Sequence, residues 1–332
     1  MNFNLLSKYR IQLMGLAALM VIVCHAPQYG VAMPYTLGKL LARGGLGVDI
    51  FLFLSGLGCW YSLSKGVNLK HWYQKRFIRI FIPYFLMQIP FWLWRFSIGS
   101  FSLSEEFLVF STIEFWTRHI GAWYVALLLP LYIITPAIYR LFLLKNRFLI
   151  ASLFVVVIIV VCMLNINMFA GKEHEILKNL QWTFGRVPSF IIGMALAPLV
   201  KRGVNVNKVV LVILPILIYY VINKLTCHEA NTEWCLVLPT LTVYVILLEK
   251  LNKASYVYNF ISWMGLVSLE SYLANIYLCA TIKKIVMPLR DDYTILTGGY
   301  LEYTIVILFG ILLSYLINIL SKQIILKFHV SN

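Results

Sequence analysis

The chain has 332 residues, of which 61% are hydrophobic and 12% are charged. Water-soluble domains carry about 25% charged residues, so this composition excludes an ordinary soluble protein and is typical of a chain embedded in a lipid bilayer. The formal net charge of +15 fits basic loops on one side of a membrane, because a nucleic-acid-binding protein would not be this apolar.

Apolar stretches close to the length that crosses a bilayer as a helix recur along the whole chain. They predict an all-α polytopic membrane protein with about ten transmembrane helices, near residues 11–28, 43–62, 77–97, 121–141, 147–169, 182–200, 207–224, 234–249, 262–282 and 301–320. An even number of spans puts both termini on one side, which then carries most of the lysines and arginines. The positive-inside rule therefore predicts that both termini are cytoplasmic. We expect residues 1–332 to form a single transmembrane domain, with no appended soluble domain.

The first two predicted helices each carry an ionisable side chain. His25 lies near the outer end of the first helix, and Asp49 lies near the start of the second, followed by Ser55. An ionisable group at membrane depth costs several kcal/mol unless it faces a partner, water or the interior of the helix bundle. The two helices are joined by a short loop, so we expect a shared polar site. The alternative is that His25 lies at the membrane interface while Asp49 forms a structural ion pair.

The densest basic cluster follows in HWYQKRFIRIFIPYF, where Arg76 and Arg79 are three residues apart and so share one helix face. Guanidinium groups bind phosphates in a bidentate manner, which favours a phosphate-binding role for the pair. Ordinary anchoring to lipid phosphates on the cytoplasmic side is an equally good interpretation.

Later spans carry further polar and aromatic candidates. Trp123 and Tyr124 open the fourth span, and Arg186 lies at the outer mouth of the sixth. The aromatic pair is also typical of the belt at a membrane interface. Glu270 and Asn275 lie inside the ninth span, where a buried glutamate carries the same energetic cost as Asp49.

Two cysteines, Cys227 and Cys235, flank a short outer loop. Their spacing is compatible with a disulfide and with two free thiols, and both alternatives stay open. No spacing of histidines and cysteines predicts a metal site.

Several segments, taken in order, resemble the integral-membrane acyltransferase 3 family of O-acyltransferases: GLAALMVIVCHA, GGLGVDIFLFLSG, RFIRIFIPYF, AWYVALLLPLYIITP, GRVPSFIIGM and WMGLVSLESYL. The resemblance implies a ten-helix core with cytoplasmic termini in the bacterial cytoplasmic membrane. It also implies transfer of an acyl group, usually acetyl, from cytoplasmic acyl-CoA to a hydroxyl of a carbohydrate or lipid-linked glycan of the cell envelope. The expected partners are acetyl-CoA, a carbohydrate or glycolipid acceptor and membrane lipids, with no metal and no nucleic acid.

The resemblance also implies roles for individual residues. His25 would be the catalytic base, oriented by Asp49 or by its competitor Glu270. The remaining candidates are Arg76, Arg79, Arg10 and Ser55 for the acyl-CoA, and Trp123, Tyr124, Arg186 and Asn275 for the acceptor.

The chain departs from the family pattern at two places. The family's arginine and aspartate before the catalytic histidine are replaced by Met14 and Ile11, with Arg10 one turn earlier. A late family histidine is replaced by Asn275, which suggests different contacts to the acceptor.

Two other classes of protein are compatible with some of these features. A multi-span transporter or flippase for a glycan precursor or small metabolite would also hold charges inside the membrane. The chain shows neither an inverted half-repeat nor a matched pair of broken helices, the features typical of such transporters. A structural scaffold would leave His25, Asp49 and the arginine pair without an explanation.

Overall fold

The computed structural model of the protein describes residues 1–27, 31–144, 146–226, 231–286 and 299–330. The described residues form helices and no strand, apart from one antiparallel bridge between Asn2 and Asn205. The shorter helices are α1 (Asn4–Lys8), α3 (Tyr35–Ala42), η2 (Arg43–Gly45), α6 (Leu103–Phe110), α7 (Ile113–Arg118), η3 (Glu233–Leu236) and α14 (Tyr256–Leu266). The longer ones are α2 (Arg10–His25), α4 (Leu46–Leu63), α5 (Leu69–Ser97), α8 (Trp123–Phe142), α9 (Arg147–Met163), α10 (Gly171–Phe184), α11 (Val187–Arg202), α12 (Lys208–Leu225), α13 (Val237–Lys250), α15 (Ser268–Val286) and α17 (Tyr300–Val330).

Among the described residues, six helical segments are long and apolar enough to cross a membrane, namely Tyr35–Leu63, Leu69–Ser97, Trp123–Phe142, Gly171–Arg202, Lys208–Leu225 and Tyr303–Lys327. These segments confirm the prediction of a multi-pass, all-helical membrane protein. They do not confirm the predicted count of about ten spans. Several of the missing spans are short: α2 has 16 residues, α9 has 17 and α13 has 14. The cytoplasmic location of both termini stays a prediction.

Close contacts between glycines and backbone carbonyls hold α2, α4, α11 and α14 together. A Cβ atom at Gly15 in α2 would collide with the carbonyl oxygen of Ile261 in α14, and one at Gly265 would collide with that of Ile11. Gly56 in α4 and Gly193 in α11 meet the opposite backbone in the same way. Small residues of this kind let membrane helices pack backbone to backbone. As a consequence α4 is buried along most of its length, and Asp49 and Ser55 lie inside the protein.

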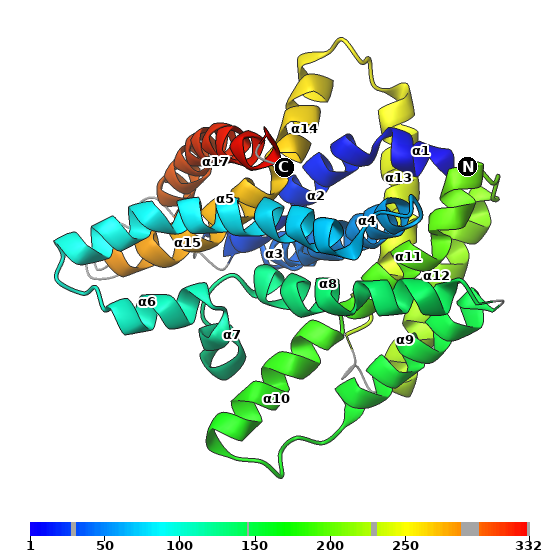
Figure 1. The fold of residues 1–332 in the computed structure, drawn as a ribbon, viewed down its shortest axis with the longest axis horizontal. Helices are drawn as coiled ribbons and strands as arrows, with labels where there is room; N and C mark the ends of the chain where they lie inside the picture. The colour runs from blue at the N-terminus through cyan, green and yellow to red at the C-terminus, as the bar shows by residue number, and fades with distance from the viewer. Residues whose placement is uncertain (28–30, 145, 227–230, 287–298, 331–332) are drawn as a thin grey trace.

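A second group of helices, α5, α8 and α15, lies against this unit, and α17 packs on α5 and α15 (Figure 1). The short helices α6 and α7 connect the end of α5 to the start of α8. Two residues that flank α7, Thr112 and His119, have left-handed backbone conformations, with φ of 67° and 56°. Helices α9 and α12 expose long apolar side chains along most of their surface, as helices that face lipid do.

Candidate active site

His25 is the last residue of α2, and its side chain is half-buried. The imidazole lies close to the carbonyl of Val21 and to the side chain of Asn275 in α15. Its Nδ1 atom is buried and has no hydrogen-bond partner among the described residues. The carbonyl of Ile22, one turn earlier, accepts a hydrogen bond from the Tyr303 hydroxyl of α17. The imidazole therefore lies at a junction of three helices, α2, α15 and α17.

Asn275 is 4% exposed, and its Oδ1 is also buried without a hydrogen bond in the described part of the chain. We predicted Asn275 as an acceptor-binding residue, and the structure places it beside His25. The His25 imidazole and the Asn275 amide are therefore neighbours in a buried position, and the amide is suited to orient the imidazole or to contact a hydroxyl presented to it.

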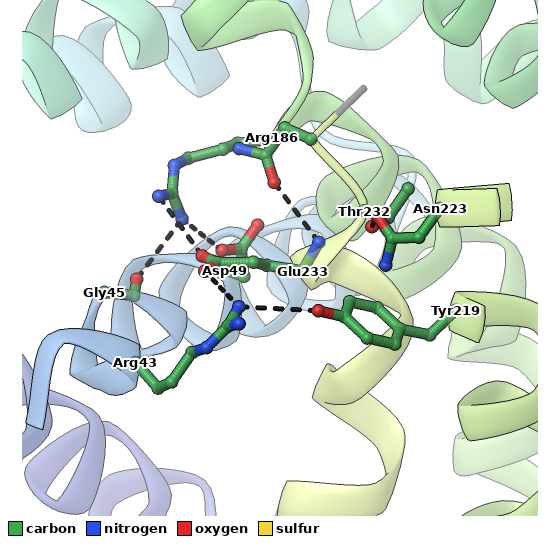
Figure 2. A network of polar contacts seen from close by, with 9 residues as sticks. Arg43, Gly45, Asp49, Arg186, Tyr219, Asn223, Thr232 and Glu233 are labelled. Atoms are coloured by element: carbon green, nitrogen blue, oxygen red, sulfur yellow. Dashed lines mark hydrogen bonds and ion pairs between the residues drawn. The ribbon is translucent and has the colours of Figure 1, made fainter. Parts of the chain in front are cut away.

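Asp49 is fully buried and has partners other than His25 (Figure 2). Its carboxylate accepts hydrogen bonds from the Arg186 guanidinium and from the Ser189 hydroxyl, the latter at 2.9 Å. Arg186 and Ser189 lie three residues apart at the start of α11 and so share one face. The contacts are those of the structural ion pair that the sequence left open as an alternative.

Arg186 is the centre of a wider network. Its guanidinium also contacts the Gly45 carbonyl at 3.3 Å and the Glu233 carboxylate at 3.4 Å. It lies over the rings of Trp123 and Trp182, 5.5 Å and 5.6 Å from their centroids. A cation held by two carboxylates and two aromatic faces is strongly fixed in position.

Sequence reasoning placed Arg186 and Trp123 in one substrate-binding set but missed Ser189, Trp182 and Glu233. Glu233 also pairs with the exposed Arg43 at 3.5 Å (Figure 2). Ser189 was within a recognised segment, GRVPSFIIGM, where its spacing from Arg186 gave a signal. Glu233 gave no such signal, because it belongs to the short η3 turn.

Glu270, the second carboxylate considered for orienting His25, lies elsewhere. It is 5% exposed and accepts a hydrogen bond of 2.8 Å from Asn318 of α17. Its electrostatic neighbours are Arg79 and Lys322, neither of which belongs to the Asp49 network. This placement favours a structural contact between α15 and α17.

Arg10, Arg76 and Arg79 gather around the second half of α4, as a shared role would require. Arg10 interacts electrostatically with both other arginines and donates to the Leu54 carbonyl at 3.3 Å. Arg76 donates to the Gly58 carbonyl at 3.0 Å and to the Ser62 hydroxyl at 2.8 Å.

None of these three arginines forms an ion pair within the described part of the chain. The Nε atom of Arg10 is buried without a hydrogen-bond partner there. Three neighbouring cations without a bound carboxylate form a site that suits a multiply charged anion such as a phosphate ester.

Ser55 is buried at the same level of α4, and its hydroxyl faces the hydroxyls of Tyr124 and Tyr132 in α8. Cys235 is buried, with 4% of its surface exposed. Cys227 lies outside the described residues, so the predicted alternatives for this cysteine pair both stay open.

The comparison with known families fits this arrangement. Residues 12–319 match a family model described as an acyltransferase domain, that of the acyltransferase 3 family. The chain belongs to the acyltransferase 3 family. This match confirms the resemblance found in the sequence and identifies the protein as a membrane acyltransferase. No curated protein and no solved structure matches the chain. The assignment of individual acyltransferase residues therefore depends on the geometry described above.

Proposed function

We propose that this acyltransferase moves an acetyl group from cytoplasmic acetyl-CoA to a hydroxyl of a carbohydrate or its lipid-linked precursor, in the bacterial cytoplasmic membrane. His25 is the general base. Arg10, Arg76 and Arg79 bind the phosphates of CoA.

The observation that carries this proposal is the placement of two sites at opposite ends of α2. Arg10 begins the helix and His25 ends it. The helix has 16 residues, and at about 1.5 Å per residue it is about 24 Å long. The extended pantetheine arm of CoA is of comparable length. A donor whose phosphates lie among the arginines thus brings its thioester towards His25.

The chemistry follows from these positions. A neutral imidazole accepts the proton of the acceptor hydroxyl as its oxygen attacks the thioester carbonyl carbon. The carbon–oxygen bond forms, the carbon–sulfur bond breaks, and the thiolate of CoA takes the proton from the imidazolium. No net proton is gained or lost. Asn275, next to the imidazole, is suited to orient it or to hold the attacking hydroxyl.

Asp49 supports this arrangement indirectly. Its contacts with Arg186 and Ser189 join α4 to α11, and the contact of Arg186 with Trp123 extends the network to the start of α8. The aromatic rings of Trp123 and Trp182 beside a fixed cation are suited to binding a carbohydrate ring through apolar C–H faces and hydroxyls.

Detergent-purified protein tests the proposal through acetyl-CoA binding and slow acetyl-CoA hydrolysis. Wild type is expected to do both. His25→Ala is expected to bind acetyl-CoA without hydrolysing it, and Arg76→Ala/Arg79→Ala is expected to lose binding. Lys208→Ala is a matched control, since Lys208 is an exposed basic residue at the start of α12. Wild type that neither binds nor hydrolyses any acyl-CoA would refute the proposal and leave transport of a glycan precursor as the alternative to test.

A further inference from the structure

A row of buried hydroxyl groups runs between the arginine cluster and His25. It consists of Tyr132, Ser55, Tyr124 and Tyr272, which are 5%, 8%, 6% and 3% exposed. The proposed mechanism leaves all four without an assigned task. Hydroxyl groups in the interior of a membrane protein are costly unless they bind a partner, so a continuous row of them indicates a function.

The inner end of the row is at the arginines. The guanidinium of Arg76 lies over the ring of Tyr132, 5.8 Å from the centroid. Tyr132 also interacts electrostatically with Arg79, and Arg10 interacts with Tyr132 in the same way. The first hydroxyl of the row is therefore adjacent to the site that suits phosphate.

The middle of the row is Ser55 of α4, whose hydroxyl faces both Tyr132 and Tyr124. The backbones of Tyr124 and Tyr132 are two turns apart on α8, about 12 Å at the usual helical rise, but their hydroxyls converge on Ser55. Ser55 has one proton to donate and faces two phenols, so the three groups retain hydrogen-bonding capacity beyond their mutual contacts.

The outer end of the row leads to His25. The Tyr272 hydroxyl accepts a hydrogen bond of 3.0 Å from the backbone N–H of Tyr124, and the two rings are 5.4 Å apart. Tyr272 precedes Asn275 by three residues on α15, so both lie on neighbouring parts of one helix face. Asn275 is the residue that faces His25.

We propose that this row binds the pantetheine arm and the thioester carbonyl of the acyl donor, through hydrogen bonds from Tyr132, Ser55, Tyr124 and Tyr272. The pantetheine arm carries two amides and a hydroxyl, which pair with phenol and serine hydroxyls. A purely apolar passage would leave these groups unpaired at a cost for each one. The inference rests on the proposed function and extends it, since it makes the donor a CoA-type thioester recognised along its arm and not by its phosphates alone.

Two acyl donors distinguish the contribution of the row of hydroxyls from that of the arginines. Acetyl-CoA carries the phosphates and the whole arm, whereas S-acetyl-N-acetylcysteamine carries the thioester and one amide without phosphates. Tyr124→Phe, Tyr132→Phe, Tyr272→Phe and Ser55→Ala each remove one hydroxyl. Each change is expected to lower kcat/KM for hydrolysis by about three- to tenfold, the usual effect of losing one hydrogen bond. Tyr124→Phe and Tyr272→Phe, nearest the thioester, are expected to affect both donors, whereas Arg76→Ala is expected to affect acetyl-CoA alone.

Tyr139→Phe is the matched control on α8, because Tyr139 lies beyond the row and packs on Trp60. Thermal unfolding of each variant checks folding, and direct binding of acetyl-CoA provides a second measurement that does not require turnover. Unchanged kcat/KM and unchanged binding in all four variants would overturn the inference while leaving the proposed function intact. An effect confined to the KM of an acceptor would also overturn it, because the row would then belong to the acceptor site. If wild type accepts neither donor, the proposed function fails and the inference fails with it.

Discussion

The buried ion pair between Asp49 and Arg186 makes a quantitative prediction about stability. Asp49 is 0% exposed and has two partners, Arg186 and Ser189. Arg186→Gln leaves the Asp49 carboxyl inside the protein with one hydroxyl donor. Breaking a buried ion pair from one side costs about 3–5 kcal/mol, because the remaining group must either carry an uncompensated charge or take up a proton in place of its partner. We expect a loss of unfolding free energy of this size.

Removing the charge of Asp49 instead of that of Arg186 is expected to cost less unfolding free energy. Asp49→Asn preserves the shape of the side chain and an acceptor for Ser189, and Arg186 keeps the Glu233 carboxylate at 3.4 Å and the Gly45 carbonyl. We expect a loss of about 1–3 kcal/mol, the cost of a weakened hydrogen bond to a charged group. In the double variant Asp49→Asn/Arg186→Gln neither charge of the pair remains. Its loss of unfolding free energy is therefore expected to be smaller than the sum of the two single losses by about 2 kcal/mol or more.

The assay is thermal and denaturant-induced unfolding of the detergent-purified variants, with Arg43→Gln as the control. Arg43 contacts the same Glu233 at 3.5 Å, but its side chain is 61% exposed. Removing it is expected to cost about 0–1 kcal/mol, as for other surface ion pairs. Additive costs in the double variant, or an Arg186→Gln variant as stable as Arg43→Gln, would show that the pair does not hold α4 to α11. If Asp49→Asn unfolds like wild type but loses turnover, Asp49 acts on the chemistry instead.

Three further predictions concern other parts of the chain. Gly15→Val is expected to destabilise the protein by about 1–3 kcal/mol through overpacking against α14. The control Gly38→Ala is expected to unfold like wild type, because Gly38 has room for a methyl group. Equal thermal midpoints for the two variants would contradict the close contact between α2 and α14. Thr112→Gly is expected to raise the thermal midpoint by relieving about 1 kcal/mol of left-handed strain at a β-branched residue, and the same change at Thr117, within α7, is expected to lower it. Asn275→Ala is expected to reduce kcat about tenfold with little change in the KM for acetyl-CoA; the reverse pattern in steady-state kinetics would place Asn275 in the donor site.

The sequence predicted which residues are functional candidates better than it predicted their partners. Charged and polar residues within apolar stretches are conspicuous, so His25 and Asp49 were found from composition alone. The side chain that each one contacts depends on how the helices pack, which a single amphipathic period does not specify. Asp49 was expected to orient His25, and the structure pairs it with Arg186.

The arginines came from two separate arguments. Arg76 and Arg79 share a face of one helix, which favoured a common anion as much as anchoring to lipid phosphates, whereas Arg10 was considered because of the family pattern. The structure places Arg10 beside the other two arginines. Ser55 was named for the acyl-CoA and Tyr124 for the acceptor, but the row that joins them to Tyr132 and Tyr272 was not predicted, because tyrosines in apolar spans are usually packing residues. Their hydroxyls become informative once the helices are assembled.

The glycine contacts described above determine which part of the protein can move when substrates bind. Backbone-to-backbone packing leaves α2, α4, α11 and α14 no freedom to slide without a collision at Gly15, Gly265, Gly56 or Gly193. On the other side of the proposed site, α5 contains Pro83 and Pro90, and α8 contains Pro130 and Pro136. Each proline removes a backbone hydrogen bond within its helix and favours bending there. We therefore expect admission of the donor to proceed by flexing of α5 and α8 against a stationary four-helix unit, with His25 carried on the part that stays still.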